Sequence, residues 1–406
     1  MTKTREEGEI NFEEEDKIYD EYAYEFNPLK KEAQYKTPAG NSVLLSFLKN
    51  FKVGMDLSKI SAPISFNNGL SSLEQQADAL RPSSYLEAFF REGDAAKRML
   101  LLLLHKIHQF SGFPSFRMEG SKGYNPILGE QCFAKWDLED GSMSELIMEQ
   151  VSHHPPVCCY YVENSENNFV SEGTYATSVI FRGNSVDLWH KGYRQLTHVN
   201  PESQKKETYY LTGPAAVCKG IFFGELKLGA NGKLVVTCPE TNTLGMITFD
   251  VHSLKLKVKQ KKTPNSKTHE LKVYRGEGST LKTISIHNLL TKEKKEMYNL
   301  ATNKIYRKRR VPLRTMSSIE SRRVWHLVTY AHRKIDEDTA QAEKHKLEEH
   351  QRQLRKERAK KKEPFVPTLF EESKEKAPNG EQPYYLITEA GKQLFEKVNE
   401  DVDDLD

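Results

Sequence analysis

Two adjacent histidines precede two prolines in the segment Glu149-Gln150-Val151-Ser152-His153-His154-Pro155-Pro156. Proline has a fixed φ and no backbone N–H, so we expect the prolines to prevent further strand pairing after the histidines. Neighbouring side chains on a strand point to opposite faces, but at a strand end one or both imidazoles can reach one ligand. Histidine donates hydrogen bonds to anions, and a phosphate beside the pair would favour the protonated imidazoles. The pair indicates an anion site, but a His-His pair alone is weak evidence for one.

A metal site is the first alternative for the two histidines, with Cys132, Cys158 or Cys159 as further ligands. Zinc sites favour spaced pairs such as Cys-x2-Cys, which the sequence lacks, so we expect neither a metal nor a cofactor. A hydrolase or metalloenzyme would need a motif such as Gly-x-Ser-x-Gly or His-Glu-x-x-His, and neither occurs. We therefore expect a protein that is not an enzyme and has no catalytic residues.

The chain around the histidines has the pattern of an antiparallel sheet. From Asn125 to about Asn288 apolar residues recur with a period of two, and Gly, Asn and Pro interrupt them at short intervals. The expected strands are Glu145–Val151, Cys158–Val162, Thr174–Arg182, Val217–Leu228, Lys233–Cys238 and Leu244–Val251. Another strand is indicated where Leu254, Leu256 and Val258 alternate with lysines, which leaves one face in water. We expect so many strands to close into a barrel, because closure removes exposed edges.

Helical periodicity flanks the strands on both sides. After a capping sequence at Gly40-Asn41-Ser42, apolar residues recur at helical spacing, namely Val43, Leu44, Phe47, Leu48, Phe51 and Met55. Further helices are predicted over roughly Asp94–Phe110, Arg323–Lys334 and Asp338–Lys362, with a short last helix near Glu389–Val398. The predicted fold class is therefore α+β, mainly β.

The composition is that of a water-soluble protein. The chain has 406 residues, of which 37% are hydrophobic, and its mean hydropathy is −0.68. The longest apolar run, Met99–Leu104, is far shorter than the roughly 20 residues that cross a bilayer. The acidic N-terminus has no secretory signal, and the five cysteines are an odd number without framework spacing. These features favour a reducing, cytoplasmic location.

Charge is distributed unevenly, although the net charge is only +3. Residues 1–30 are acidic, whereas Lys344–Lys362 is strongly basic. Such a basic segment can bind nucleic acid, contact the anionic face of a cytoplasmic membrane, or remain a solvated helix. Because it carries no interleaved aromatic residues, we expect no nucleic-acid partner.

Several motifs resemble those of the oxysterol-binding protein family and follow in the same order. The histidine segment resembles the family's fingerprint, and Lys122–Glu130, with its Asn-Pro-x-Leu-Gly-Glu sequence, resembles a second motif. The lid segment of short yeast members is similar to Ser46–Lys49, Asp56–Ser58 and Ser61–Pro63. The C-terminal helical part is similar to Glu320–Arg322, Trp325 and Leu347–Lys356. The resemblance covers roughly residues 41–363 and indicates a short member without a pleckstrin-homology domain.

By this resemblance the fold is an incomplete antiparallel β-barrel of many strands, which encloses a lipid tunnel beneath an N-terminal helical lid. The implied parts are an acidic, disordered leader at 1–38, a lipid-binding domain at 39–363 and a charged C-terminal tail at 364–406. The domain divides into a lid at 39–66, a helical region at 67–124, the barrel at 125–290 and a C-terminal helical part at 291–363.

The resemblance also implies a site for a phosphoinositide headgroup. Its residues are Lys122, Asn125, His153, His154, Lys344, Glu348 and Arg352. The last three are spaced by four residues, so they form one stripe on a helix, where Glu348 can orient both cations. Lys, Arg and His hold a phosphate monoester through charge-assisted hydrogen bonds. The alternative for the stripe is a set of ordinary surface ion pairs, which contribute little.

The lid and the tunnel have expected residues of their own, which are Leu44, Phe47, Leu48, Phe51 and Gln109. The four apolar residues would cover the tunnel when closed and touch a membrane when open, although such a stripe is usually core. A cover is needed because each exposed methylene costs about 0.8 kcal/mol. Gln109 lies at the interval before Lys122 where some family members place a glutamine facing the sterol hydroxyl. The alternative is an exposed glutamine at a helix end.

We therefore expect an intracellular carrier that binds either a sterol or phosphatidylserine-like lipid or phosphatidylinositol 4-phosphate, and exchanges them between membranes. It would be a cytoplasmic monomer in transient contact with anionic membrane surfaces. The alternative is a lipid sensor or scaffold that signals through a partner without net transfer. The second lipid, the membranes served and a membrane receptor for the acidic leader stay open at this point.

Overall fold

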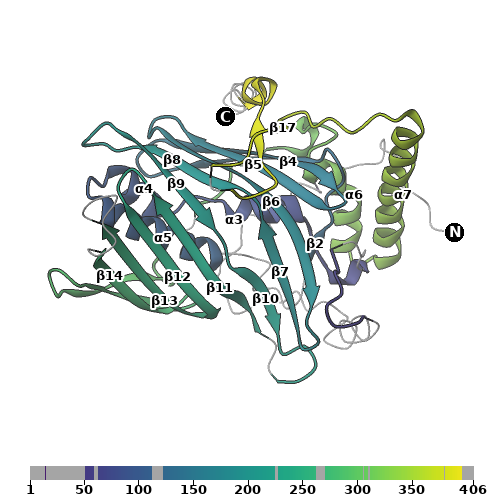
Figure 1. The fold of residues 1–406 in the computed structure, drawn as a ribbon. Coiled ribbons are helices and arrows are strands. Elements are labelled where there is room, and N and C mark those ends of the chain that lie inside the picture. Colours follow the sequence, from purple (N-terminus) through teal and green to yellow (C-terminus); the bar gives the residue numbers. More distant parts are fainter. Residues whose placement is uncertain are drawn as a thin grey trace.

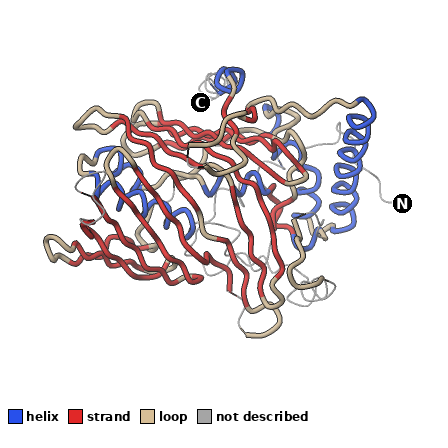
Figure 2. Tube along the Cα trace, in the orientation of Figure 1, coloured by secondary structure: helices blue, strands red, loops and turns tan. Residues whose placement is uncertain are grey.

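The computed structural model describes Glu14 and residues 51–58, 63–111, 122–224, 227–261, 270–304, 306–309, 311–378 and 380–395. The expected lid residues Leu44, Phe47 and Leu48 lie outside these ranges, as does all of the expected leader except Glu14. Figure 1 shows a large curved sheet with helices behind it and two further helices beside one end. Figure 2 shows how strands dominate the described chain.

The sheet contains 14 described strands, and its neighbouring strands pair antiparallel. They are β3 (Gln131–Asp137), β4 (Met143–His153), β5 (Pro156–Asn164), β6 (Phe169–Phe181), β7 (Ser185–Lys191), β8 (Arg194–Val199), β9 (Lys206–Thr212), β10 (Ala215–Lys219), β11 (Lys227–Cys238), β12 (Thr243–Val251), β13 (Ser253–Lys261), β14 (Glu270–Ser279), β15 (Thr283–Asn288) and β16 (Lys294–Asn299). The order is β16-β15-β14-β13-β12-β11-β10-β7-β6-β5-β4-β3, while β8 pairs with β6 and β9, and β9 with β11. The predicted fold class is confirmed.

The sheet is open, so the expectation that the strands close on themselves is wrong. Within the described chain β3 and β16 are the two ends of the order, and no ladder joins them. The outer edge of β3 instead forms isolated bridges, Trp136 with Lys308 and Gln131 with Glu320. The segment that follows β16 therefore covers this edge, which removes the need for closure. The incomplete barrel implied by the resemblance agrees with this arrangement.

The concave face of the sheet is filled by helices from the N-terminal half. These are α3 (Ser72–Ala79), α4 (Ser84–Arg91) and α5 (Ala95–Ser111), which Figure 1 shows behind the strands. The apolar run Met99–Leu104 is buried, and α5 packs on β11 to β14. The helix predicted over Asp94–Phe110 is therefore confirmed, and it supplies much of the core.

In the later strands, buried apolar residues alternate with exposed polar residues, so one face of the sheet is buried and the other is in water. In β13 the apolar residues Leu254, Leu256 and Val258 are buried, while the lysines between them are exposed. This confirms the predicted strand with one face in water. The expected strands around residues 145–162 and 244–251 are also confirmed, as β4, β5 and β12.

Two helices stand beside the start of the sheet, at the right in Figure 1. They are α6 (Ser321–Arg333) and α7 (Glu337–Lys361), as predicted, and they follow a 3₁₀ turn at Leu313–Thr315. A parallel pair, β1 (Asn67–Ser71) with β2 (Lys122–Tyr124), follows a second 3₁₀ turn at Ile64–Phe66.

The buried carboxylate of Glu130 ties α6 to this pair. It accepts hydrogen bonds from Trp325 Nε1 at 2.9 Å, from Ser321 Oγ at 2.7 Å and from Ser71 Oγ. Burial raises the pKa of Glu130. These bonds are needed because a buried carboxylate without donors would be strongly unfavourable. They fix where α6 lies relative to β2.

Two sequence predictions fail at glycines. The strand predicted over Val217–Leu228 is broken after β10, because Gly220 and Gly224 adopt φ values of 78° and 94° and turn the chain. The helix predicted to reach Met55 is absent over residues 51–58, where Gly54 has φ 89°. There the backbone pairs with the end of β6 instead, as Gly54 N donates to Phe181 O at 2.7 Å.

A C-terminal hairpin covers the convex face of β4 to β6. It consists of β17 (Phe370–Glu372) and β18 (Tyr385–Ile387), and residues 389–395 then form a helical turn. Leu369, Phe370 and Phe395 pack against outward side chains of β4 and β5. The short helix predicted near Glu389–Val398 is confirmed up to residue 395, beyond which the structure describes nothing.

Candidate functional site

The two histidines lie at the tip of the hairpin formed by β4 and β5. His153 is the last residue of β4 and is paired with Pro156, the first residue of β5. The expectation that the prolines stop strand pairing is therefore wrong. Proline is tolerated as the first residue of a strand, since its carbonyl can still accept a hydrogen bond. The tight turn brings the rings of His153 and His154 to 4.5 Å between centroids.

Lys122 and Asn125 come from β2 and the residues directly after it. The Lys122 ammonium donates a hydrogen bond to Asn125 Oδ1. The backbone of Lys122 is fixed in turn by Asn67, whose Nδ2 donates to Lys122 O at 3.0 Å. The side chain of Lys122 is half-buried. The parallel pairing of β1 and β2 thus presents the lysine in a defined position.

The predicted stripe of Lys344, Glu348 and Arg352 lies on α7, and the exposure of these side chains increases along the helix. Lys344 Nζ is 3.9 Å from Glu348 Oε1, and Arg352 Nη2 is 3.5 Å from Glu348 Oε2. The side chain of Lys344 is 4% exposed and that of Arg352 is 44% exposed. The alternative of ordinary surface ion pairs fits Arg352, which also pairs with Glu349 at 2.8 Å, but not the buried Lys344.

The three segments meet closely enough for their charges to interact. The pKa of Lys122 is lowered to about 8, first by burial and second by the charge of Lys344, while the charge of Glu348 acts in the opposite direction. Burial also lowers the pKa of His153, followed by the effect of His154. The carboxylate of Glu348 raises the pKa of His153, so α7 lies within electrostatic range of this histidine as well. All seven expected headgroup residues therefore belong to segments that face one region.

Sequence reasoning missed Arg355, whose charge also lowers the pKa of His153. It follows Arg352 by three residues on α7, which places both on one helix face. That spacing is the signal that could have found it.

This region has the chemistry of an anion site. Its cations, Lys122, Lys344, Arg352 and Arg355, outnumber the carboxylates of Glu348 and Glu349, and His153 Nδ1 is buried without a hydrogen-bond partner. Lys, Arg and His donors around one space suit a ligand with several charged oxygens. In the described part of the chain no group of three or more His, Cys, Asp and Glu could hold a metal. The cysteines considered as ligands are buried free thiols, and burial raises the pKa of each.

A model of the oxysterol-binding protein family matches residues 43–334. The chain belongs to the oxysterol-binding protein family. This family is defined by lipid binding and not by catalysis. No helix in the described residues is long and apolar enough to cross a membrane.

Curated relatives extend the family match over most of the chain. Human oxysterol-binding protein-related protein 5 is 33% identical over 366 residues, which are 85% of this chain and 40% of that protein. The oxysterol-binding protein-like protein OBPa of Candida albicans is 28% identical over 357 residues, covering 86% of this chain and 80% of that protein. The chain spans about two fifths of the length of the human and mouse relatives it matches.

Solved domains of the family have the same fold. The Osh1 ORD domain in complex with cholesterol has a TM-score of 0.74 at 22% identity and covers 89% of each chain. The Saccharomyces cerevisiae Osh3 ORD in complex with PI(4)P has a TM-score of 0.64 at 22% identity, covering 89% of this chain and 94% of that one. This likeness establishes the architecture.

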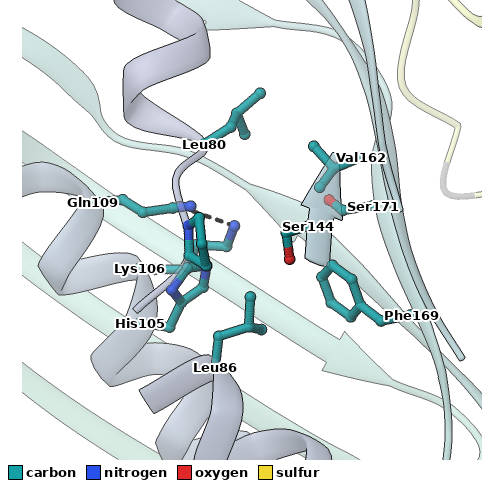
Figure 3. A pocket seen from close by; sticks show the side chains of 10 residues that line it. Leu80, Leu86, His105, Lys106, Gln109, Ser144, Val162, Phe169 and Ser171 are labelled. Atoms are coloured by element: carbon teal, nitrogen blue, oxygen red, sulfur yellow. Dashed lines mark hydrogen bonds between the residues drawn. The ribbon is translucent and has the colours of Figure 1, made fainter. Parts of the chain in front are cut away.

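Phe51 and Gln109 are the two expected lid and tunnel residues that the structure describes, and both lie away from the histidines. Phe51 packs against the buried Phe181 and Ile221, near the turn between β6 and β7. Gln109 is buried, with 9% of its surface exposed, so it is not the exposed residue of the alternative. It lines a pocket between α5 and strands β4 to β6, which Figure 3 shows.

That pocket is small and mixed in character. Its volume is about 10 Å³, which is room for about one water molecule. Apolar walls come from Leu80, Leu86, Val162 and Phe169, and polar groups come from both sides. The lining residues are Leu80, Pro82, Leu86, His105, Lys106, Gln109, Ser144, Val162, Phe169 and Ser171. In Figure 3 the side chains of α5 face those of the sheet across it.

Proposed function

We propose that the chain carries one lipid at a time between membranes. The cargo is either phosphatidylinositol 4-phosphate or a second lipid, a sterol or phosphatidylserine. The observation that carries this proposal is the convergence of Lys122, His153 and Lys344, from three distant segments, around one carboxylate. Family membership supports it, as do the structural neighbours that contain cholesterol and PI(4)P.

The headgroup phosphate would be held by charge-assisted hydrogen bonds. Lys122 and Lys344 supply ammonium donors, and the imidazoles at the hairpin tip supply ring N–H groups. Glu348 orients the α7 cations and keeps the cluster from being purely positive. A phosphate monoester carries about two charges at neutral pH, so it would offset the mutual repulsion of Lys122 and Lys344.

The apolar part of the cargo would occupy the interior of the sheet. Each methylene left in water costs about 0.8 kcal/mol, so a carrier must cover its cargo during transfer. Because both lipids would use the same interior, binding of one excludes the other, which is a strongly unfavourable coupling. A gradient of phosphoinositide between two membranes could then drive net movement of the second lipid. We propose that the carrier acts as a cytoplasmic monomer that touches anionic membranes transiently.

Extraction from liposomes tests the proposal directly. Purified, delipidated protein is incubated with mixed-lipid liposomes and re-isolated, and its bound lipid is identified by mass spectrometry. We expect stoichiometric phosphoinositide, displaced by one competing lipid whose identity distinguishes sterol from phosphatidylserine. A folded protein that extracts no lipid would contradict the carrier proposal.

A histidine variant tests the headgroup assignment. His153→Ala with His154→Ala should weaken phosphoinositide extraction by tenfold or more, since hydrogen bonds to a charged group contribute about 1.5–3 kcal/mol each. Extraction of the second lipid should be unchanged. His345→Ala with His350→Ala, which removes two exposed histidines of α7, is the matched control. Equal loss of both lipids in a folded variant would refute the headgroup role. Tight binding without bilayer-to-bilayer transfer would instead identify a sensor or scaffold.

A further inference from the structure

A second cationic region lies on the concave face of the sheet, far from the histidines. Lys106 of α5 lines the pocket of Figure 3 opposite Ser144, near the start of β4. His153 is at the other end of the same strand. Since a strand rises about 3.4 Å per residue, the nine-position separation of Ser144 and His153 places the two regions roughly 30 Å apart. The interior region is therefore distinct from the proposed headgroup site.

Lys106 has only neutral partners in the described structure. Its ammonium donates to Gln109 Oε1 at 3.0 Å, and Gln109 Nε2 donates onward to Arg81 O at 3.4 Å. The pKa of Lys106 is lowered to about 7, first by burial and second by the charge of Arg194. Arg194, on β8, is thus a second cation within electrostatic reach of Lys106.

The direct contacts of Arg194 are with neutral groups as well. Its Nη2 donates to His190 O at 3.4 Å, and its guanidinium lies 5.7 Å from the ring centroid of Tyr175. Its Nε is buried without a hydrogen-bond partner. Burial lowers the pKa of His190 to about 3, with Arg194 as the second cause, so this imidazole is neutral. The two cations have no counter-ion among the ion pairs of the described residues.

The sheet keeps a carboxylate close to Arg194 on the opposite face. Glu172 of β6 is paired with Gln195 of β8 and hydrogen-bonds to its side chain. Gly173, the next residue, is paired with Arg194. Since successive side chains on a strand alternate, Glu172 points to the convex face while Arg194 points to the concave one. In the described structure Lys106 and Arg194 are therefore two interior cations that no carboxylate pairs with, although an acidic residue is one position away from the partner of Arg194.

We propose that Lys106 and Arg194, with Gln109, bind the anionic end of an amphiphile that enters the sheet with this end first. The ligand class is an acidic lipid with a small charged group, a carboxylate or a sulfate, on an apolar body. This proposal rests on the proposed function, because it assumes that the interior receives a lipid.

The physical reason is that buried cations without a counter-ion are unfavourable, and an anion would compensate both at once. A neutral hydroxyl could accept a hydrogen bond from Lys106 but would leave the charges uncompensated. The space of about 10 Å³ holds about one water molecule, so the region suits the smallest anionic groups and has least room for a phosphorylated sugar. The apolar body would lie along β6, whose inward residues Tyr175, Thr177 and Val179 are only half-buried.

Matched lipid pairs test the charge requirement. The full chain, delipidated, is offered oleate against oleyl alcohol, and cholesterol sulfate against cholesterol, in neutral liposomes. Bound lipid is measured by mass spectrometry. We expect at least a tenfold preference for one of the acidic partners. A preference within the oleyl pair alone identifies a fatty acid, and one within the sterol pair alone an acidic sterol. No preference in either pair overturns the proposal.

Substitutions of the proposed binding residues test whether Lys106 and Arg194 cause the preference for acidic lipids. Lys106→Met and Arg194→Gln should each reduce it at least fivefold, while phosphoinositide extraction stays normal. Lys191→Met, which removes an exposed lysine of β7, is the control and should retain it. An unchanged preference in folded Lys106→Met protein would overturn the assignment. If a variant does not fold, the wild-type comparison still decides. Failure of phosphoinositide extraction by the wild-type protein would count against the proposed function instead.

Discussion

Replacing Lys344 with methionine separates a built anion site from a chance cluster of charges. Lys344 is buried, its ammonium lies 3.9 Å from Glu348 Oε1, and its charge lowers the pKa of Lys122. Methionine keeps most of the apolar stem and removes only the charge. Glu348 retains Arg352 at 3.5 Å, so no carboxylate is left without a partner.

The expected loss follows from one charge-assisted hydrogen bond. Such a bond contributes about 1.5–3 kcal/mol, which corresponds to roughly 10- to 150-fold in affinity for a phosphoinositide. In the lipid-free protein the same substitution should favour the charged form of Lys122, although it weakens binding of the lipid. Because Lys344 lowers the pKa of Lys122, the substitution should raise that pKa above its present value of about 8. Burial, the larger cause, should still keep it below the ordinary lysine value.

Two measurements check this prediction. Extraction of phosphatidylinositol 4-phosphate from liposomes gives the affinity, and NMR of ¹³C-methylated lysines gives the pKa of Lys122. Lys346→Met is the control, because Lys346 lies on the same helix, is 49% exposed and pairs with Glu343. We expect the control to bind within about twofold of the wild type. Equal losses in the two variants, or an unchanged pKa of Lys122, would refute the reasoning.

Two further predictions concern pH and stability. Since the pKa of Lys122 is about 8 in the free protein and binding requires its charged form, phosphoinositide affinity should fall by up to about tenfold between pH 7 and 9. Lys122→Arg, which stays charged, should flatten the profile, and an unchanged slope would contradict this. Arg98→Met should lower the free energy of unfolding by about 3–5 kcal/mol, because it leaves the buried carboxylate of Glu207 without its cation. Urea denaturation measures this, and a loss below about 1 kcal/mol would argue against it.

Strand prediction worked where the pattern came from alternation of buried and wet faces, as in β13. It failed over Val217–Leu228 because the apolar residues continue through Gly220, where the chain turns. The hairpin of β17 and β18 was missed for a different reason. Each of its strands has three residues, which is too short for a period of two to be recognised.

The candidate site shows a second limit of local patterns. Spacing alone predicted the stripe on α7, but nothing local connects Lys344 to the histidines or to Lys122. Only the resemblance brought these residues together, and the structure places their segments around one region. The interior cations were missed because charged residues beside apolar runs look like the polar face of a helix or strand. Lys106, which lies between the buried His105 and Ile107, is the clearest example.

Because the C-terminal hairpin covers only part of the sheet, we expect two regions of the sheet to differ in their stability against local unfolding. Strands β4 to β6 are covered on both faces, by the interior core and by Leu369, Phe370 and Phe395. Strands β13 to β16 expose lysines and glutamates on their outer face. Backbone amides protected by packing on both sides exchange with solvent only in large openings, whereas those at a thinly covered margin exchange in small ones. We therefore expect hydrogen exchange to be slowest around β5, so that the wall carrying the histidine hairpin stays fixed while the opposite margin fluctuates.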